Sequence, residues 1–289
     1  MSSTRMPSRA EERPDRRISA LRTTFRTLGP VAPRAAAAWA ERIFCSPPRQ
    51  ATRPHEEAFL ATGRAFTVDG GGMRLRAWEW GEGPLVLLVH GWGSRAGRWA
   101  ALAPRLVADG YRVVTFDAPG HGRTPGRTSS LPAFADALMA MGDALGPAHG
   151  VAGHSLGGAA IALALHRGLG AGRAVLIASP SNPETFADRF AATLSIPPAV
   201  RDRMQANLER RLQIKWKDLH IPTLAAGLSA PAFVIHDRDD TDVGVDEATA
   251  IAAAWPGAEL LLTSGLGHRG IIRDPDVLAR TAAFLGRSP

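Results

Sequence analysis

The sequence has a single cysteine, Cys45, in 289 residues. One thiol cannot form a disulfide within the chain, and this usage agrees with a reducing cytoplasm, which we predict as the location. Cys45 stands in WAERIFCSPP, at the end of an expected helix. We interpret it as a small buried hydrophobic residue rather than as a nucleophile.

Long hydrophobic segments are missing as well. No apolar stretch approaches the ~18–20 residues that cross a bilayer, so no membrane span is predicted. Arg16–Arg17 lack a continuous apolar segment behind them because Arg22 and Arg26 interrupt it. A secretory or twin-arginine signal is therefore not expected.

The formal net charge is +7, but the body of the chain has little positive excess. Residues 1–60 contain 11 Lys or Arg and 6 Asp or Glu, a net of +5, whereas residues 61–289 contain 23 and 21, a net of +2. A nucleic-acid groove needs cations in the folded body, so no nucleic-acid partner is predicted. We interpret residues 1–60 as a basic extension, partly disordered, without periodicity over 1–30 and with a short helix near 35–44.

Cofactor signatures are also absent. The histidine spacings show no metal-ligand pattern such as H-x-x-x-H. The glycines at 70–72 lack the helix and the lysine that follow in a phosphate-binding loop. We predict no cofactor and no metal site.

What the sequence does contain is a series of apolar runs that alternate with helical patterns. These runs are PLVLLVH (84–90), YRVVTFD (111–117), GVAG (150–153), AVLIAS (174–179), APAFVIHD (230–237) and AELLLTSG (258–265). Such alternation predicts an α/β fold with a mainly parallel, doubly wound sheet. Residues 64–80 predict an antiparallel hairpin at the edge of this sheet.

One segment departs from the alternation. Residues 181–226 have an amphipathic helical pattern and are too long for a simple connection. We predict that they form a small helical cap over the carboxyl ends of the strands, where open α/β sheets bind ligands. The core then comprises residues 61–180 and 227–289.

The segment GHSLG (153–157) has the form G-x-S-x-G between an expected strand and an expected helix. In such a sharp turn the central residue, Ser155, has a strained backbone and its side chain is exposed for reaction. A serine becomes a nucleophile when a histidine removes its proton and a carboxylate orients that histidine. Asp240 follows the expected strand APAFVIHD and His268 follows AELLLTSG, the last two apolar runs, in the chain order Ser–Asp–His of α/β-hydrolases. Asp239 is the alternative carboxylate.

From about residue 64 to residue 286 the chain resembles the α/β-hydrolase-fold superfamily, and within it the bacterial serine hydrolases of the esterase kind. The resemblance rests on HGWGS (90–94), DAPGHGRT (117–124), GHSLGG (153–158), HDRDDTDV (236–243) and GLGHR (265–269), in the family's order. It implies that the backbone N–H groups of Trp92 and Leu156 form an oxyanion hole. In the family's pattern, Asp240 is the acid if Asp237 stands in place of a glycine.

Four further histidines are expected to support the site rather than to react. We expect His90 to hydrogen-bond the oxyanion loop, His121 to bond a turn, His154 to pack beside Ser155, and His236 to lie in the core.

The leading hypothesis is a serine hydrolase that cleaves a small carboxylic ester or thioester through an acyl-enzyme on Ser155. A carbon–carbon bond hydrolase or an acyltransferase would use the same three residues. A hydrolase fold that binds a ligand without turnover is a further alternative. The sequence leaves the natural substrate and the oligomeric state open.

Overall fold

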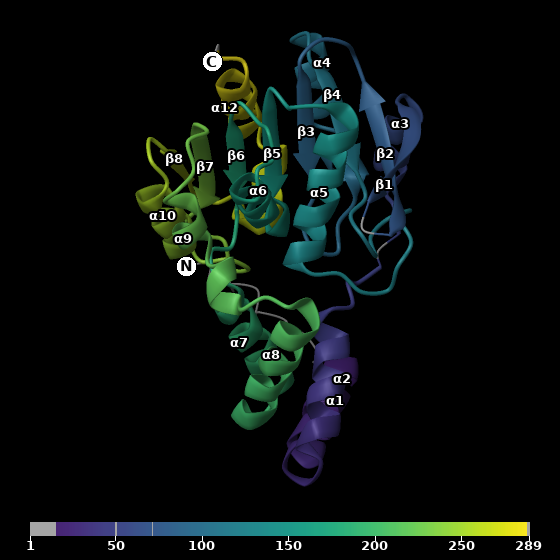
Figure 1. Cartoon of the computed structure of the whole chain (residues 1–289), viewed down its shortest axis with the longest axis vertical. Helices are drawn as coiled ribbons and strands as arrows, with labels where there is room; N and C mark the ends of the chain where they lie inside the picture. The colour runs from purple at the N-terminus through teal and green to yellow at the C-terminus, as the bar shows by residue number, and fades with distance from the viewer. Residues whose placement is uncertain (1–15, 50, 71, 288–289) are drawn as a thin grey trace, which may run out of the picture.

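The computed structural model of the chain describes residues 16–49, 51–70 and 72–287. It consists of a layered α/β core and a lobe of helices beyond one end of the sheet (Figure 1). The expectation of disorder for residues 1–15 lies outside the described residues.

Eight strands form one sheet in the order β1-β2-β4-β3-β5-β6-β7-β8. The β1–β2 and β2–β4 pairs are antiparallel and every other pair is parallel. The predicted hairpin and the mainly parallel sheet are confirmed. The strands are β1 (Arg64–Gly70), β2 (Met73–Trp80), β3 (Leu85–Val89), β4 (Arg112–Phe116), β5 (Gly150–His154), β6 (Ala174–Ile177), β7 (Ala232–Asp237) and β8 (Glu259–Thr263).

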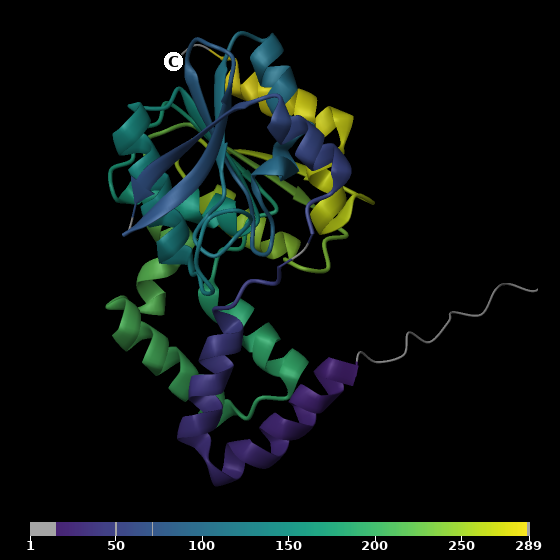
Figure 2. The ribbon, with the colours of Figure 1, turned by 90° about the vertical axis from the view of Figure 1, so that its right-hand side faces the viewer.

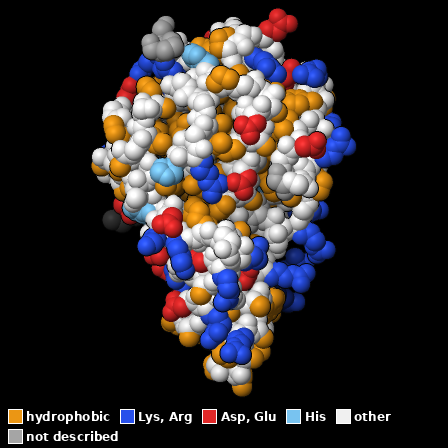
Figure 3. Space-filling model, in the orientation of Figure 1, with side chains coloured by type: hydrophobic (Ala, Val, Ile, Leu, Met, Phe, Trp, Pro, Cys, Tyr) orange, Lys and Arg blue, Asp and Glu red, His pale blue; other side chains and the backbone are white. Residues whose placement is uncertain are grey.

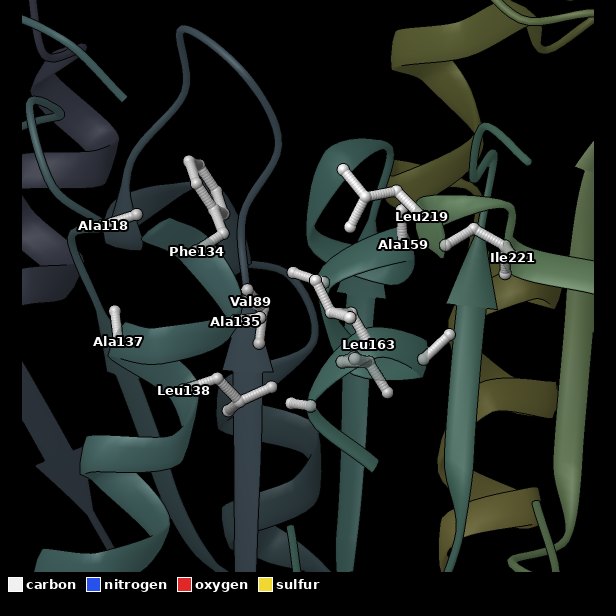
Figure 4. Packing of buried hydrophobic residues seen from close by; sticks show 14 of the residues in the cluster. Val89, Ala118, Phe134, Ala135, Ala137, Leu138, Ala159, Leu163, Leu219 and Ile221 are labelled. Atoms are coloured by element: carbon white, nitrogen blue, oxygen red, sulfur yellow. The ribbon is translucent and has the colours of Figure 1, made fainter. Parts of the chain in front are cut away.

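Both faces of the sheet are covered, which is why strands β3 and β6 are apolar at every position. In β3, Leu87 and Val89 pack in one hydrophobic cluster, whereas Val86 and Leu88 pack in the other. Figure 4 shows Val89 beside residues of α5 (Leu131–Leu145) and α6 (Leu156–His166). The opposite face carries α3 (Pro54–Ala61), η1 (Ala96–Trp99), α4 (Ala103–Ala108) and α12 (Pro275–Leu285). Helix α10 (Val245–Ala254) packs against β7, and its buried apolar residues belong to the same cluster as those of α5 and α6.

The helical lobe lies beyond the carboxyl ends of the parallel strands (Figures 1 and 2). It consists of α1 (Arg16–Val31), α2 (Pro33–Phe44), α7 (Pro183–Leu194) and α8 (Pro198–Leu212), and we call these four helices the helical lobe. Helix α2 packs on α8, and α1 packs on α7. The lobe is joined to the core through η2 (Trp216–Leu219) and α9 (Ile221–Ala225). Two separated parts of the chain therefore build one structure.

The expectation that residues 1–30 have no periodicity is wrong for residues 16–30, which belong to α1. Ile18, Leu21, Phe25 and Leu28 recur at helical spacing and all pack into the core cluster. Phe25 is fully buried and stacks on Trp39 of α2 with ring centroids 4.7 Å apart. The apolar face of α1 is narrow and lies among many arginines, so its periodicity is weak in the sequence. A helix of this kind is stabilised mainly by tertiary packing.

The described residues contain no helix that is both long and apolar enough to cross a membrane. Figure 3 shows Lys and Arg side chains over much of the helical lobe. The cytoplasmic location stays a prediction.

Candidate active site

Ser155 occupies the sharp turn between β5 and α6. Its backbone has φ 54° and ψ −126°, a left-handed conformation that costs an L-residue free energy. The flanking glycines make the turn possible: a Cβ on Gly153 would lie 2.5 Å from the carbonyl carbon of Gly157, and a Cβ on Gly157 would lie 2.4 Å from the carbonyl oxygen of Val89. The turn presents the Ser155 side chain at the carboxyl edge of the sheet.

Replacing Gly157 with alanine is expected to lower kcat/KM for ester cleavage by about 10²–10³-fold, because the new methyl group would push the start of α6 away from β3 and displace the Leu156 N–H. We expect a loss of roughly 1–3 kcal/mol in unfolding free energy as well. Kinetics and thermal unfolding measure both effects. Gly227→Ala is the matched control, since a Cβ at that position would lie 4.0 Å from the carbonyl oxygen of Leu224. Equal loss in both variants would contradict the explanation.

Three side chains from three different loops form a hydrogen-bonded chain at this edge. The Oγ of Ser155 lies 3.1 Å from Nε2 of His268. Nδ1 of the same ring lies 2.7 Å from Oδ2 of Asp240. The loops follow β5, β8 and β7, whose carboxyl ends meet at one edge because the strands are parallel. The structure thus brings together the three residues that the sequence singled out.

Asp240 is held in place by the backbone as well as by His268. Its Oδ1 accepts hydrogen bonds from the N–H groups of Asp242 and Val243, at 2.8 and 2.9 Å. Burial raises the pKa of Asp240, but the bonds from His268 and Val243 outweigh it, so the pKa lies below its ordinary value. A carboxylate that stays ionised can orient an imidazole and stabilise its charge.

The neighbouring carboxylates of Asp237 and Asp239 bind backbone N–H groups of the loop after β8. Oδ1 and Oδ2 of Asp237 accept hydrogen bonds from the N–H groups of Gly267 and Leu266, at 3.0 and 3.1 Å. Oδ2 of Asp239 accepts a bond from the N–H of Gly265 at 2.7 Å. Together they hold the loop that carries His268. Sequence analysis missed this role, although a run of acids opposite a glycine-rich loop was its visible signal.

The backbone N–H groups of Trp92 and Leu156 flank the serine turn. Among the described residues, neither group donates a recorded hydrogen bond to another part of the protein. Leu156 is the first residue of α6, so its N–H lies at the positive end of the helix dipole. Both donors are therefore free to bind an oxygen that develops negative charge.

Two buried histidines hold the loop that carries Trp92. Nδ1 of His90 donates to the carbonyl of Gly91 at 2.7 Å, and Nε2 of His121 accepts from the N–H of Gly93 at 3.0 Å. Burial lowers the pKa of His121 to about 4 and keeps His90 well below its ordinary pKa. Nε2 of His90 also accepts from the N–H of Ala118 at 3.0 Å, and Nδ1 of His121 donates to the carbonyl of Pro119 at 2.9 Å. Each ring therefore has one donor and one acceptor nitrogen, which is the neutral form of imidazole.

His154 contacts the backbone of His268 directly. Its Nε2 donates a hydrogen bond to the carbonyl oxygen of His268 at 2.8 Å. Burial, followed by repulsion from His268, lowers the pKa of His154 to about 3. His236 is fully buried, and its Nε2 lies 3.0 Å from the carbonyl oxygen of Val243. Both side chains position the loops around the site.

Two cavities meet at Ser155. The first, the apolar cavity, extends under the helical lobe and is lined by Phe44, Phe186, Leu208, Leu212, Trp216 and Leu219, with Leu156 and Ala159 on the core side. The second, the arginine cavity, opens on the side of His268 and is lined by Arg53, Arg95, Arg98, Arg189 and Arg269, together with Glu56 and Asp242. Trp92 and Phe186 border both cavities.

The aromatic wall of the apolar cavity joins the two parts of the helical lobe. Phe44, at the end of α2, stacks on Trp216 with ring centroids 6.0 Å apart and meets the edge of Phe190 at 5.1 Å. Within the described part of the chain, no group of three or more His, Cys, Asp or Glu side chains is arranged to hold a metal ion.

Comparison with known proteins identifies the family. The model of the alpha/beta hydrolase family matches residues 86–281. A pimeloyl-[acyl-carrier protein] methyl ester esterase of Aromatoleum aromaticum is 50% identical over 56 residues, which is 19% of this chain and only 22% of that protein. A non-heme chloroperoxidase of Streptomyces lividans is 26% identical over 268 residues, covering 75% of this chain and 96% of that protein.

Solved structures agree on the fold. The carboxylesterase CesB from Bacillus subtilis superimposes with a TM-score of 0.60 at 18% sequence identity, covering 81% of this chain and 97% of that one. The match of the family model covers most of the layered core, including all three residues of the hydrogen-bonded chain. The chain is an enzyme of the alpha/beta hydrolase family, related to bacterial esterases and hydrolases.

Proposed function

We propose that the protein hydrolyses a carboxylic ester or thioester through an acyl-enzyme on Ser155. The observation that carries this proposal is the continuous hydrogen-bonded chain from Asp240 through His268 to the strained serine. The free N–H donors of Trp92 and Leu156 support it. Relatives named as esterases agree with an ester as the substrate.

In the first half of the reaction, Nε2 of His268 takes the proton of the Ser155 hydroxyl as its Oγ attacks the substrate carbonyl. The carbonyl oxygen becomes negatively charged and is bound by the Trp92 and Leu156 N–H groups. Asp240 stabilises the positive imidazole. The bond to the alcohol or thiol then breaks, and that leaving group receives the proton from Nε2.

In the second half, a water molecule takes the place of the leaving group. His268 removes one proton from it, and the resulting hydroxide adds to the acyl carbonyl. Collapse of this intermediate releases a carboxylic acid and returns the proton to Ser155. The same three residues thus act twice, with no cofactor taking part in these steps.

We assign the two halves of the substrate to the two cavities. Leu156 lines the apolar cavity, and His268 lines only the other one. Because His268 must protonate the leaving group, the alcohol or thiol belongs on the side of the arginine cavity. The acyl chain then occupies the apolar cavity, under the helical lobe. We propose on this basis that residues 181–226 act as the cap, and that α1 and α2 complete it.

Lengthening the acyl chain is expected to raise kcat/KM, because each buried methylene contributes about 0.8 kcal/mol, or up to about fourfold. A series of 4-nitrophenyl esters from acetate to octanoate measures the effect, with the acetate as internal reference. We expect the increase to continue through butyrate and to stop where the chain meets the aromatic wall. A maximum at acetate would contradict the placement of the acyl chain.

A further inference from the structure

The arginine cavity carries an excess of positive charge. Five arginines line it and only two acids, Glu56 and Asp242, which leaves a net charge of +3. Such a concentration of guanidinium groups in one opening creates a positive potential that attracts an anion. The protein itself compensates only part of this charge.

One arginine is paired within the protein. Nη1 of Arg95 lies 3.3 Å from Oε2 of Glu56, and both side chains are buried. Arg189 is exposed, and its guanidinium donates to the backbone carbonyls of Thr241 and Asp242. Carbonyl oxygens satisfy its donors but carry no full charge, so the positive charge of Arg189 remains.

The other three arginines have no anionic partner. Across residues 16–49, 51–70 and 72–287, no carboxylate lies within 4.0 Å of the guanidinium groups of Arg53, Arg98 or Arg269. Arg98 is partly buried, and among the described residues its guanidinium donates only to the carbonyl of Arg269, at 3.3 Å. With Arg189, four guanidinium groups around one opening have no carboxylate partner among the described residues.

The neighbouring positive charges also affect the pKa of Arg98. Burial, followed by repulsion from Arg273, lowers the pKa of Arg98 to about 10. Arg53 and Arg269 repel it further, and only Glu56 opposes them. Arg98 is still charged at pH 7, so an anion bound here would gain attraction from several guanidinium groups at once.

We propose that the arginine cavity is a subsite for a negatively charged group, a carboxylate or a phosphate, on the alcohol or thiol side of the scissile bond. This inference rests on the proposed function, because the proton transfer from His268 is what assigns the leaving group to this side. The natural substrate then has two unlike halves: an apolar acyl chain and an anionic leaving group.

Three butyrate esters test the proposal. Their leaving groups are 4-hydroxyphenylacetamide, 4-hydroxyphenylacetate and 4-hydroxybenzylphosphonate. In each, a methylene separates the variable group from the phenol, so the phenols differ little in acidity while the charge changes from neutral to anionic. We expect kcat/KM to be about five- to tenfold higher for the anionic esters at low ionic strength, and the difference to shrink with added salt. Preference for the phosphonate over the carboxylate would identify a phosphate as the natural group.

The double variant Arg53→Gln/Arg98→Gln should lose this preference, measured as the ratio of kcat/KM for the anionic esters to kcat/KM for the neutral ester in the same variant. Arg105→Gln/Arg203→Gln is the matched control: both side chains are exposed, neither lines the cavity, and the total charge changes equally. The control should keep the preference. A loss in both variants would show that overall charge, rather than this subsite, attracts the anion.

The outcomes distinguish failure of the anionic subsite from failure of the esterase proposal. If the wild-type protein cleaves the neutral and anionic esters equally, the subsite is refuted and the esterase proposal stands. If it cleaves none of them and Ser155 does not react with a fluorophosphonate, the proposed function fails and this inference fails with it.

Discussion

Replacing Ser155 with alanine is expected to lower the turnover of 4-nitrophenyl butyrate by about 10⁵-fold or more, with the fold intact. The alanine removes the only atom that forms the acyl-enzyme, whereas the oxyanion donors and the cavities remain. A small residual rate over water is expected, because those donors still stabilise a carbonyl attacked directly by water. Steady-state kinetics measures the loss.

Covalent labelling supplies the control for this variant. A fluorophosphonate should add its mass to a peptide containing Ser155 in the wild-type protein and should not label the Ser155→Ala variant. Thermal unfolding should be nearly unchanged, because alanine has the same Cβ as serine and adopts the same positive φ at this position. Wild-type turnover by the variant would refute the acyl-enzyme mechanism, and labelling at another serine would relocate it.

Replacing Asp240 with asparagine is expected to lower kcat by about 10⁴-fold. Oδ2 of Asp240 accepts the Nδ1 hydrogen of His268 at 2.7 Å, which leaves Nε2 free to accept the serine proton. An amide in this place can present its NH₂ group instead, which would favour the wrong tautomer. It would also fail to stabilise the positive imidazole that forms during the reaction.

Asp239→Asn is the matched control, because it removes one charge from the adjacent residue of the same loop. Oδ2 of Asp239 binds only the N–H of Gly265 among the hydrogen bonds recorded for the described residues. We expect at most about a tenfold loss of kcat, together with a small loss of stability. If Asp239→Asn lost as much activity as Asp240→Asn while remaining folded, the assignment of the acid would be wrong.

The active-site elements were predictable to the extent that local chemistry determines them. The turn at Ser155 needs glycines two positions before and after it, so its signature is contained within five adjacent residues. His268 and the acids near 240 follow apolar strands, and parallel strands bring their carboxyl ends to one edge whatever the details of packing. The choice between Asp240 and Asp239 was different. It depends on which carboxylate faces a ring 28 residues further along the chain, a matter of loop geometry.

The N-terminal region shows the opposite case. The helix α1 has an apolar face of only a few residues among many arginines, and its stability comes from the contact of Phe25 with Trp39 and from packing on α7. None of these partners is visible in a local pattern. The contact between Phe44 of α2 and Trp216 of the insertion is a second example. It joins two segments about 170 residues apart, so no local pattern predicts it.

The amino-acid sequence by itself determined the order of the apolar runs that form the strands, the sharp turn at Ser155, and the presence of a histidine and a carboxylate at the same edge of the sheet, because these depend on spacing and on backbone geometry. Only the tertiary structure decided which carboxylate meets the histidine, where the N-terminal helices pack, and how the space around the serine divides into an apolar and a cationic side. The arginines at 53, 98, 189 and 269 are scattered along the chain, and electrostatic potential depends on distance in space rather than on position in the sequence.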